Sequence, residues 1–393
     1  MQNKTLLMVL GIRPDVIRAS IMIRELRHAL GPGFKLVWSG QHYSDNLKDV
    51  FFRELEIAPP EIELEIEGSS DAELVASMIS KLSVVIEREK PLAVVFLGDT
   101  NTVTGSIAAA QLNVPVVHIE GCMRSYDWRM PEEKYRTIAD HLSDLIYCYL
   151  EDYKAQGIAE GIPEDNIVVT GNPIVDVINE YFLSGKLRMP EIELLSLLKN
   201  KYGLINKDFF VMTCHRRENI EEIDSLRNIM RLVEMSPYPV LFPAGYRTQR
   251  MIDFFKLSLP ANLRLVDPIG YLELLELITN SKGVITDSGT IVEEAAVLGI
   301  PSLQMRRSTE RPQVYTCGAS IKFDPSDLDG IDKKIEQLLI MNGAVWEHPF
   351  GDGKASKRIV EDLVKRFELN TFAGHQKEKF EPYSSYSYSS ENT

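Results

Sequence analysis

Three acidic residues lie where successive apolar segments of the sequence end. Asp99 follows the apolar run Leu92–Leu97, Glu120 follows the run 116–119, and Glu132 opens the next helical pattern. When strands run parallel, the ligand crevice lies outside their carboxyl ends. Carboxylates that face one crevice can differ in pKa, so that one accepts a proton while another donates one. Each residue could by itself cap a helix or carry a surface charge, but their recurrence at consecutive strand ends favours acid–base chemistry.

A second segment with chemical potential joins an apolar strand to a helix. Asp287, Ser288 and Gly289 stand at this junction. Gly289 lets the backbone approach a ligand closely, and the free N–H groups of a helix N-terminus bind phosphate. Glu294 lies one turn into the helix, where its carboxylate can accept hydrogen bonds from both hydroxyls of a ribose. The alternative is that Asp287 and Ser288 are ordinary N-caps. The pattern indicates a nucleotide without proving one.

Cationic residues follow other predicted strands. Arg13 comes shortly after the first strand and can form a bidentate hydrogen bond with phosphate. His215 follows the predicted strand 209–213, and an imidazole there can be charged near neutral pH and pair with a phosphate or a leaving group. Arg311 belongs to the basic run 305–312, near the same expected crevice. Each of them could instead be a structural or solvated residue, so they support phosphate binding only as a set.

Several familiar cofactor motifs are missing from the sequence. The first strand is not followed by GxGxxG, which argues against a tightly bound dinucleotide, and neither HExxH nor a P-loop occurs. The cysteines form no CxxC pair, which fits reduced thiols and argues against a zinc site. We therefore expect no NAD and no metal ion as cofactor. The cysteines are Cys122, Cys148, Cys214 and Cys317.

Bulk composition limits the partners of the protein. The chain has 393 residues and a formal net charge of −14, which makes nucleic acid and anionic membrane surfaces unfavourable partners. No apolar run approaches the ~20 residues of a membrane span, and the N-terminal residues enter a strand pattern without a signal-peptide pattern. We expect a cytoplasmic protein that holds any phosphate with local cations and helix N-termini.

Strand-like and helix-like segments alternate along the chain, which predicts an α/β fold with parallel sheets built from βαβ units. A turn region near 172–190 divides it into residues 1–172, which carry the acidic residues, and 173–355, which carry the phosphate-binding segment. The final helix, 356–367, has one apolar face and must dock on another element. The tail 370–393 is rich in Ser, Tyr, Glu and Lys, and we expect it to be poorly ordered.

Taken in order, the motifs of the chain resemble those of the non-hydrolysing UDP-N-acetylglucosamine 2-epimerases, from about residue 6 to residue 366. Any one motif would be weak, but the ordered set is specific. The motifs are Gly11-Ile12-Arg13-Pro14-Asp15, Ser39-Gly40-Gln41-His42, Gly98-Asp99-Thr100, His118-Ile119-Glu120-Gly121, Pro131-Glu132-Glu133, Thr170-Gly171-Asn172, His215-Arg216-Arg217-Glu218, Asp287-Ser288-Gly289 and Glu310-Arg311-Pro312.

This resemblance implies a GT-B architecture, in which two Rossmann-like, doubly wound domains face a central cleft and the last helix crosses back to the first domain. It also implies a homodimer that interconverts UDP-N-acetylglucosamine and UDP-N-acetylmannosamine without NAD or metal. A base would remove the C2 proton of the UDP-acetamido sugar while UDP leaves C1. UDP would then add back to the 2-acetamidoglucal intermediate as a proton reaches the opposite face.

The resemblance also implies roles for individual residues. Asp99, Glu120 and Glu132 would handle protons at the two faces of the sugar, and the resemblance does not decide which residue serves which face. His215 would be a further catalytic residue that, with Arg13, stabilises the departing diphosphate. The residues implied in binding the substrate or its UDP moiety are Arg13, Arg18, Gln41, His42, Ser288, Gly289, Glu294 and Arg311.

The sequence departs from the common family pattern at a few positions. Arg18 stands where many members have Lys, and Thr290 stands where many have a second Gly. Gly245 lies in a loop where bacterial members carry a His that helps to bind a second, activating UDP-N-acetylglucosamine. Arg18 and Thr290 also resemble the branch that epimerises a 6-deoxy UDP sugar. Two alternatives therefore stay open: such a related sugar as substrate, or a GT-B glycosyltransferase.

Overall fold

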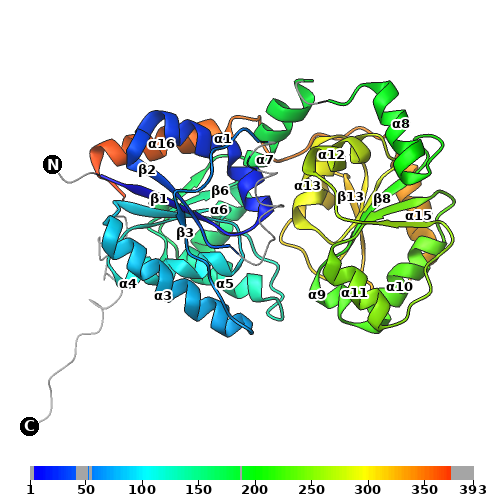
Figure 1. The fold of residues 1–393 in the computed structure, drawn as a ribbon, viewed down its shortest axis with the longest axis horizontal. Coiled ribbons are helices and arrows are strands. Elements are labelled where there is room, and N and C mark those ends of the chain that lie inside the picture. Colours follow the sequence, from blue (N-terminus) through cyan, green and yellow to red (C-terminus); the bar gives the residue numbers. More distant parts are fainter. Residues whose placement is uncertain (1–3, 41–51, 53–54, 186–187, 373–393) are drawn as a thin grey trace, which may run out of the picture.

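The alternating strands and helices build two sheets of parallel strands, each at the centre of its own lobe (Figure 1). The computed structural model describes residues 4–40, 52, 55–185 and 188–372. We call residues 4–185 together with the last helix the N-lobe, and residues 188–350 the C-lobe. This two-sheet architecture confirms the predicted fold class.

The N-lobe sheet has the strand order β3-β2-β1-β4-β5-β6-β7. The chain order therefore reverses direction between β1 and β4, which makes a topological switch point where ligands of such sheets bind. Leu97 at the end of β4 is level with Ile119 at the end of β5, so the loops after these strands emerge side by side. The strands are β1 (Leu6–Leu10), β2 (Phe34–Trp38), β3 (Ile62–Glu63), β4 (Ala93–Leu97), β5 (Val116–Ile119), β6 (Leu145–Cys148) and β7 (Ile167–Val169).

The C-lobe sheet repeats this logic with the order β10-β9-β8-β11-β12-β13. Its switch point lies between β8 and β11, whose last residues Thr213 and Thr286 are paired in register and share a hydrogen bond of 2.6 Å between their hydroxyls. The strands are β8 (Phe210–Thr213), β9 (Val240–Pro243), β10 (Leu263–Val266), β11 (Val284–Thr286), β12 (Ser302–Met305) and β13 (Ser320–Phe323).

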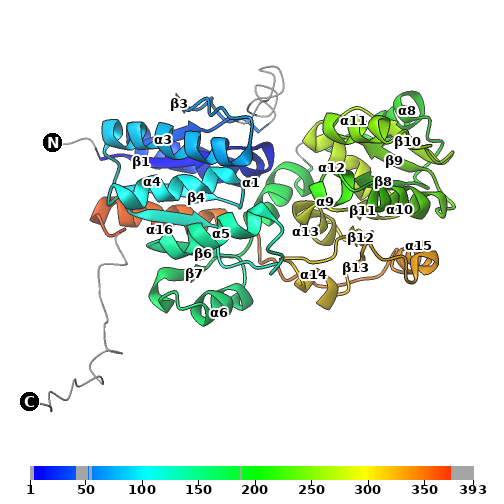
Figure 2. The same cartoon turned by 90° about the horizontal axis from the view of Figure 1, so that it is seen from below.

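Helices cover both faces of each sheet (Figure 2). Because successive strand residues point to opposite faces, apolar runs buried on both sides form these strands. The N-lobe helices are α1 (Arg13–Leu30), α3 (Asp71–Glu89), α4 (Ser106–Gln111), α5 (Pro131–Leu142), α6 (Glu151–Ala159) and α7 (Pro173–Val177), which continues as a π-helix (Ile178–Leu183). The C-lobe helices are α8 (Glu191–Tyr202), α9 (Arg217–Ile220), α10 (Ile223–Glu234), α11 (Tyr246–Phe254), α12 (Tyr271–Thr279), α13 (Gly289–Val297), α14 (Gln313–Thr316) and α15 (Ile331–Ile340).

The last helix, α16 (Ala355–Leu369), lies beside α1 of the N-lobe (Figure 1). It is longer at both ends than the predicted 356–367. Of the tail predicted to be poorly ordered, the structure describes residues 370–372, and Phe372 is buried in the N-lobe core. Within the described part of the chain, no helix has both the length and the apolar character needed to cross a membrane.

Helix α16 is fastened to α7 by one buried carboxylate. Asp176 accepts hydrogen bonds from the backbone N–H groups of Ala355 and Ser356, at 3.1 and 2.8 Å, and only 6% of its surface is exposed. It therefore satisfies two of the donors that every helix N-terminus leaves unpaired.

We predict that Asp176→Ala destabilises the protein by about 1–3 kcal/mol, because two buried N–H donors lose their acceptor. Urea unfolding followed by circular dichroism measures the change. Glu361→Ala, on the exposed face of the same helix, is the matched control and should leave the unfolding midpoint unchanged. A midpoint shift of equal size in both variants would contradict this account of Asp176.

Candidate active site

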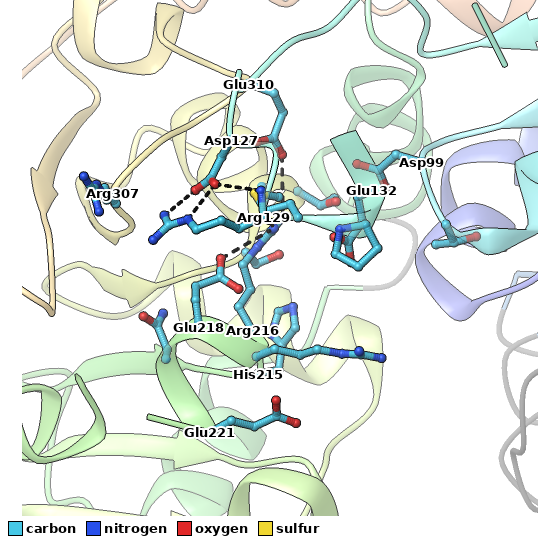
Figure 3. A pocket seen from close by; sticks show the side chains of 18 of the residues that line it. Asp99, Asp127, Arg129, Glu132, His215, Arg216, Glu218, Glu221, Arg307 and Glu310 are labelled. Atoms are coloured by element: carbon cyan, nitrogen blue, oxygen red, sulfur yellow. Dashed lines mark hydrogen bonds and ion pairs between the residues drawn. The ribbon is translucent and has the colours of Figure 1, made fainter. Parts of the chain in front are cut away.

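A cleft of about 720 Å³ lies between the carboxyl ends of the two sheets and takes its lining from both lobes. Figure 3 shows its acidic and basic side chains, with Asp99 and Glu132 from the N-lobe opposite His215 and Arg216 from the C-lobe. The position follows from the topology, because both switch points open into the same space. The predicted site residues that line the cleft are Arg18, Asp99, Glu120, Glu132, His215, Ser288, Gly289 and Arg311.

Two of the three predicted carboxylates differ in their electrostatic surroundings. Burial opposes ionisation of Asp99, but Arg136, with Arg311 and Arg216, outweighs it and holds the pKa of Asp99 below its usual value. Burial and the nearby charge of Asp99 raise the pKa of Glu132. The cleft can thus present one ionised carboxylate and one carboxyl group that holds its proton more tightly, which is the arrangement that acid–base catalysis requires.

The third carboxylate, Glu120, is held in a strained and buried position. Its φ angle is +75°, a left-handed conformation that non-glycine residues seldom adopt. Its carboxylate forms ion pairs with Arg18 and, at 2.9 Å, with Arg311, and it accepts a hydrogen bond of 2.9 Å from the hydroxyl of Tyr149. Such strain persists only where the surroundings over-determine it, and it is concentrated at functional sites.

The C-lobe wall of the cleft is organised by Asp287, which is fully buried. Its carboxylate accepts hydrogen bonds from the backbone N–H groups of His215 and Arg216, both at 2.9 Å, and from the side-chain amide of Asn219 at 3.1 Å. Despite burial, His215 and these hydrogen bonds keep the pKa of Asp287 below its usual value. The His215 ring has its Nδ1 atom 3.3 Å from Asp287 and is 57% exposed, so its other edge is free to meet a ligand.

Helix α13 presents its N-terminus to the cleft. Ser288 caps it by accepting a hydrogen bond of 3.4 Å from the N–H of Ile291. At Gly289 the backbone passes so close to the C-lobe arginines that a Cβ atom would lie 2.8 Å from Cζ of Arg311 and 2.9 Å from Oε1 of Glu310. A larger residue here would have to displace these two buried side chains, and the glycine leaves the helix N-terminus open as an anion site.

Two predicted binding residues do not line this cleft, and two others lie outside the described residues. Arg13 begins α1, and its Nη1 donates a hydrogen bond of 3.2 Å to the carbonyl of Ile269 in the other lobe. Glu294 is buried and accepts a hydrogen bond of 3.0 Å from the hydroxyl of Tyr271. Gln41 and His42 fall in the segment 41–51 that the structure does not describe.

The ion pairs that support the predicted residues could not be predicted from strand ends and motifs. Arg311 reaches Glu293 at 2.7 Å, and both are buried. Arg136 lies three residues after Glu133 on one face of α5, a helical spacing that is the only signal of their pairing in the sequence. We call the whole set the inter-lobe ion cluster, and it comprises Asp99, Glu120, Glu133, Glu293, Glu310, Arg18, Arg136, Arg216, Arg306 and Arg311.

His118, two residues before Glu120, serves the structure. Its Nδ1 pairs with Asp140 at 2.7 Å, and its Nε2 is 2.8 Å from the carbonyl oxygen of Gly98. It thereby ties strand β5 to the loop after β4 and to helix α5. Among the residues that the structure describes, no group of three or more His, Cys, Asp or Glu side chains is arranged to hold a metal ion.

Burial raises the pKa of Glu294 to about 8, against the opposing effect of the Tyr271 hydrogen bond. Between about pH 4.5 and 8 the unfolded chain releases this proton while the folded chain keeps it, so stability falls as pH rises. We predict that Glu294→Gln, which keeps an acceptor for Tyr271 but cannot ionise, is more stable than the wild type at pH 8 by on the order of 4 kcal/mol.

The advantage of the Gln variant should almost disappear near pH 4.5, where the folded carboxyl is protonated and the unfolded one is already half protonated. Urea unfolding of both proteins at the two pH values measures it. A stability difference of the same sign and size at both pH values would contradict a buried neutral carboxyl.

Comparison with known proteins identifies relatives over almost the whole chain. Residues 24–364 match the family model described as UDP-N-acetylglucosamine 2-epimerase. The UDP-N-acetylglucosamine 2-epimerase of Methanocaldococcus jannaschii is 35% identical over 91% of this chain and 98% of its own length. A UDP-2,3-diacetamido-2,3-dideoxy-D-glucuronate 2-epimerase of Pseudomonas aeruginosa is 31% identical over 92% and 99%.

Solved structures agree with these sequence matches. The M. jannaschii UDP-GlcNAc 2-epimerase in complex with UDP-GlcNAc and UDP superimposes with a TM-score of 0.83 at 33% identity, covering 92% of this chain and 99% of that one. The UDP-GlcNAc 2-epimerase from Neisseria meningitidis bound to UDP-GlcNAc gives a TM-score of 0.80 at 30% identity, covering 92% and 100%.

Proposed function

Because the chain belongs to the UDP-N-acetylglucosamine 2-epimerase family, we propose that it interconverts UDP-N-acetylglucosamine and UDP-N-acetylmannosamine in the cleft between its lobes. It is an isomerase by family. The observation that carries the proposal is the composition of the cleft. The N-lobe contributes Asp99, Glu120 and Glu132, and the C-lobe contributes a helix N-terminus at Ser288 and Gly289.

The proposed reaction has two halves that mirror each other. An ionised carboxylate takes the proton from C2, the electrons of that C–H bond form the C1–C2 double bond, and the bond between C1 and the diphosphate oxygen breaks with its electrons on UDP. In the second half, UDP adds back to C1 of the 2-acetamidoglucal while an acid delivers a proton to the other face of C2. The different pKa shifts of Asp99 and Glu132 support this division of labour.

The leaving diphosphate needs positive charge that is already in place. The N-terminus of α13 opens into the cleft at Gly289, and His215 follows the neighbouring strand with one ring edge exposed. The backbone N–H of Ser288 already donates to Oγ1 of Thr286 at 3.0 Å, so Ser288 contributes through its position in the cleft wall. Dipoles and cations fixed before the reaction stabilise developing charge at no cost in reorganisation. We assign UDP binding to this wall of the cleft, with Arg311 as the link to the N-lobe.

The first test is proton exchange at C2 without any acceptor. The enzyme is incubated in deuterated water with UDP-N-acetylglucosamine, and NMR is used to follow C2. We expect deuterium at C2 and appearance of the manno epimer, because the abstracted proton exchanges with solvent before it returns. Release of UDP that depends on an added acceptor, with no deuterium at C2, would indicate a glycosyltransferase instead.

A panel of UDP-acetamido sugars in the same assay decides the sugar. A 6-deoxy substrate that exchanges at C2 much faster than UDP-N-acetylglucosamine would favour the alternative indicated by Arg18 and Thr290, both of which line the cleft. We also propose that neither NAD nor a metal ion takes part. The exchange rate should therefore be the same with added EDTA and with enzyme that has been stripped by gel filtration.

We predict that Asp99→Asn and Glu132→Gln each lower the rate of C2 exchange by about 10²–10⁴-fold, the usual contribution of a positioned acid or base. UDP affinity, measured by calorimetry, should change little, since UDP is assigned to the other lobe. Glu361→Gln on the exposed face of α16 is the control and should match the wild type. Full exchange activity in both cleft variants would refute the proton-transfer roles.

A further inference from the structure

We infer that Arg136 is a positioning residue for the reaction, which orients Asp99 from behind the cleft and keeps it ionised. The inference rests on the proposed function and names a residue to which neither the sequence motifs nor the family comparison assigns a role. Arg136 does not line the cleft, so it would act through Asp99 and not by touching the sugar.

The guanidinium group of Arg136 pairs with a different carboxylate through each of its two terminal nitrogens. Nη2 of Arg136 forms an ion pair with Oδ2 of Asp99, and Nη1 forms one of 2.5 Å with Oε2 of Glu133. The planar guanidinium group therefore bridges two carboxylates from different elements, Asp99 in the loop after β4 and Glu133 in the first turn of α5. A lysine ammonium is a point donor at the end of a flexible chain and cannot reproduce this bridge.

Glu133 holds the guanidinium group of Arg136 in place. Its carboxylate accepts hydrogen bonds from the N–H of Ser125 at 3.0 Å, the hydroxyl of Ser125 at 2.9 Å and the N–H of Tyr126 at 2.8 Å. Glu133 is 1% exposed, so these bonds are not in competition with bulk water. The Nη1 atom of Arg136 is thus held by a carboxylate that is itself fixed by three hydrogen bonds, which leaves Nη2 to pair with Asp99.

The buried charge of Arg136 is balanced by carboxylates from both lobes. Arg136 is 2% exposed, and a buried cation of this kind is tolerated only with paired carboxylates. Oε1 of Glu310, from the C-lobe, lies 4.0 Å from Nη2 of the same arginine. Without Arg136, Asp99 would face the like charge of Glu310 with the C-lobe arginines Arg311 and Arg216 left to offset it. The charged groups that act on Asp99 are Asp15 of α1, Glu132 and Arg136 of α5, and Arg216, Glu310 and Arg311 of the C-lobe.

Arg136 and Asp99 carry opposite charges, so the arginine favours the ionised form of Asp99. Arg136 makes the largest contribution that lowers the pKa of Asp99. Removing its charge raises that pKa, so the enzyme needs a higher pH before Asp99 can accept a proton. A residue with a purely structural role would lower the amount of folded enzyme but would leave the pH profile of that enzyme unchanged.

The test measures the pH profile of kcat/KM for Arg136→Gln and Arg136→Lys in the C2 exchange assay with UDP-N-acetylglucosamine. For Arg136→Gln we expect the acidic limb to move up by about one pH unit and kcat to fall by about 10–100-fold. For Arg136→Lys we expect a smaller displacement of the limb, because the charge is kept, but a clear loss of kcat, because the bridge is lost. UDP affinity by calorimetry should stay within about twofold of the wild type.

Arg27→Lys is the matched control. Arg27 lies on α1 in the same lobe, pairs with Glu61 at 2.8 Å and makes hydrogen bonds to two carbonyl groups, all away from the cleft. It should show the wild-type pH profile.

An unchanged acidic limb with kcat within twofold of the wild type in Arg136→Lys would overturn the inference, even if Arg136→Gln failed to fold. Absence of C2 exchange in the wild-type enzyme would instead overturn the proposed function, so the two failures are distinguishable.

Discussion

Burial of charge between the lobes is the constraint on which the rest of this structure depends. Arg311 is 3% exposed and is surrounded by Glu120 of the N-lobe and by Glu293 and Glu310 of the C-lobe. Moving such groups out of water costs several kcal/mol for each ion unless every charge meets an opposite one. The inter-lobe ion cluster meets this condition only when loops from both sheets come together, so the cleft and the charges that line it depend on one another.

The topology explains why those loops meet. Each sheet has a point where its strand order reverses, and the loops at this point splay apart and leave a crevice. The loops after β4 and β5 bring Asp99 and Glu120, and the loops after β8 and β11 bring His215 and Ser288. The positive φ angle of Glu120 is the local cost of aiming its carboxylate at the other lobe, and the ion pairs with Arg18 and Arg311 offset it.

Acid–base chemistry in such a site depends on differences between like groups. Asp99 and Glu132 are carboxylates in one cleft, yet the arginines near Asp99 favour its ionised form, while burial and the charge of Asp99 favour the protonated form of Glu132. An isomerase that moves a proton between two faces of a sugar needs this asymmetry. For Asp99 it arises chiefly from the placement of Arg136, which itself carries out no chemistry in the proposed reaction.

Much of the fold and most of the candidate site could be predicted from the sequence, because they follow from local rules. Apolar runs that end in Gly98-Asp99 or in Asp287-Ser288-Gly289 mark strand ends, and parallel sheets place ligands at strand ends. These rules placed seven predicted residues around one cleft, and the family resemblance added Arg18. They failed to place Arg13 and Glu294 in its lining, since a side chain near a crevice can turn toward Ile269 or Tyr271 instead.

The sequence by itself determined the two parallel sheets, their order along the chain and the family. Each strand and each motif can be recognised from neighbouring residues, and their order is the order of the chain. Only the tertiary structure decided the pairing of Arg136 with Asp99 and of Arg311 with Glu120, whose members lie 37 and 191 positions apart. The physical reason is that the ionisation of a carboxylate depends on charges within a few ångströms, and folding alone selects which distant residues lie that near.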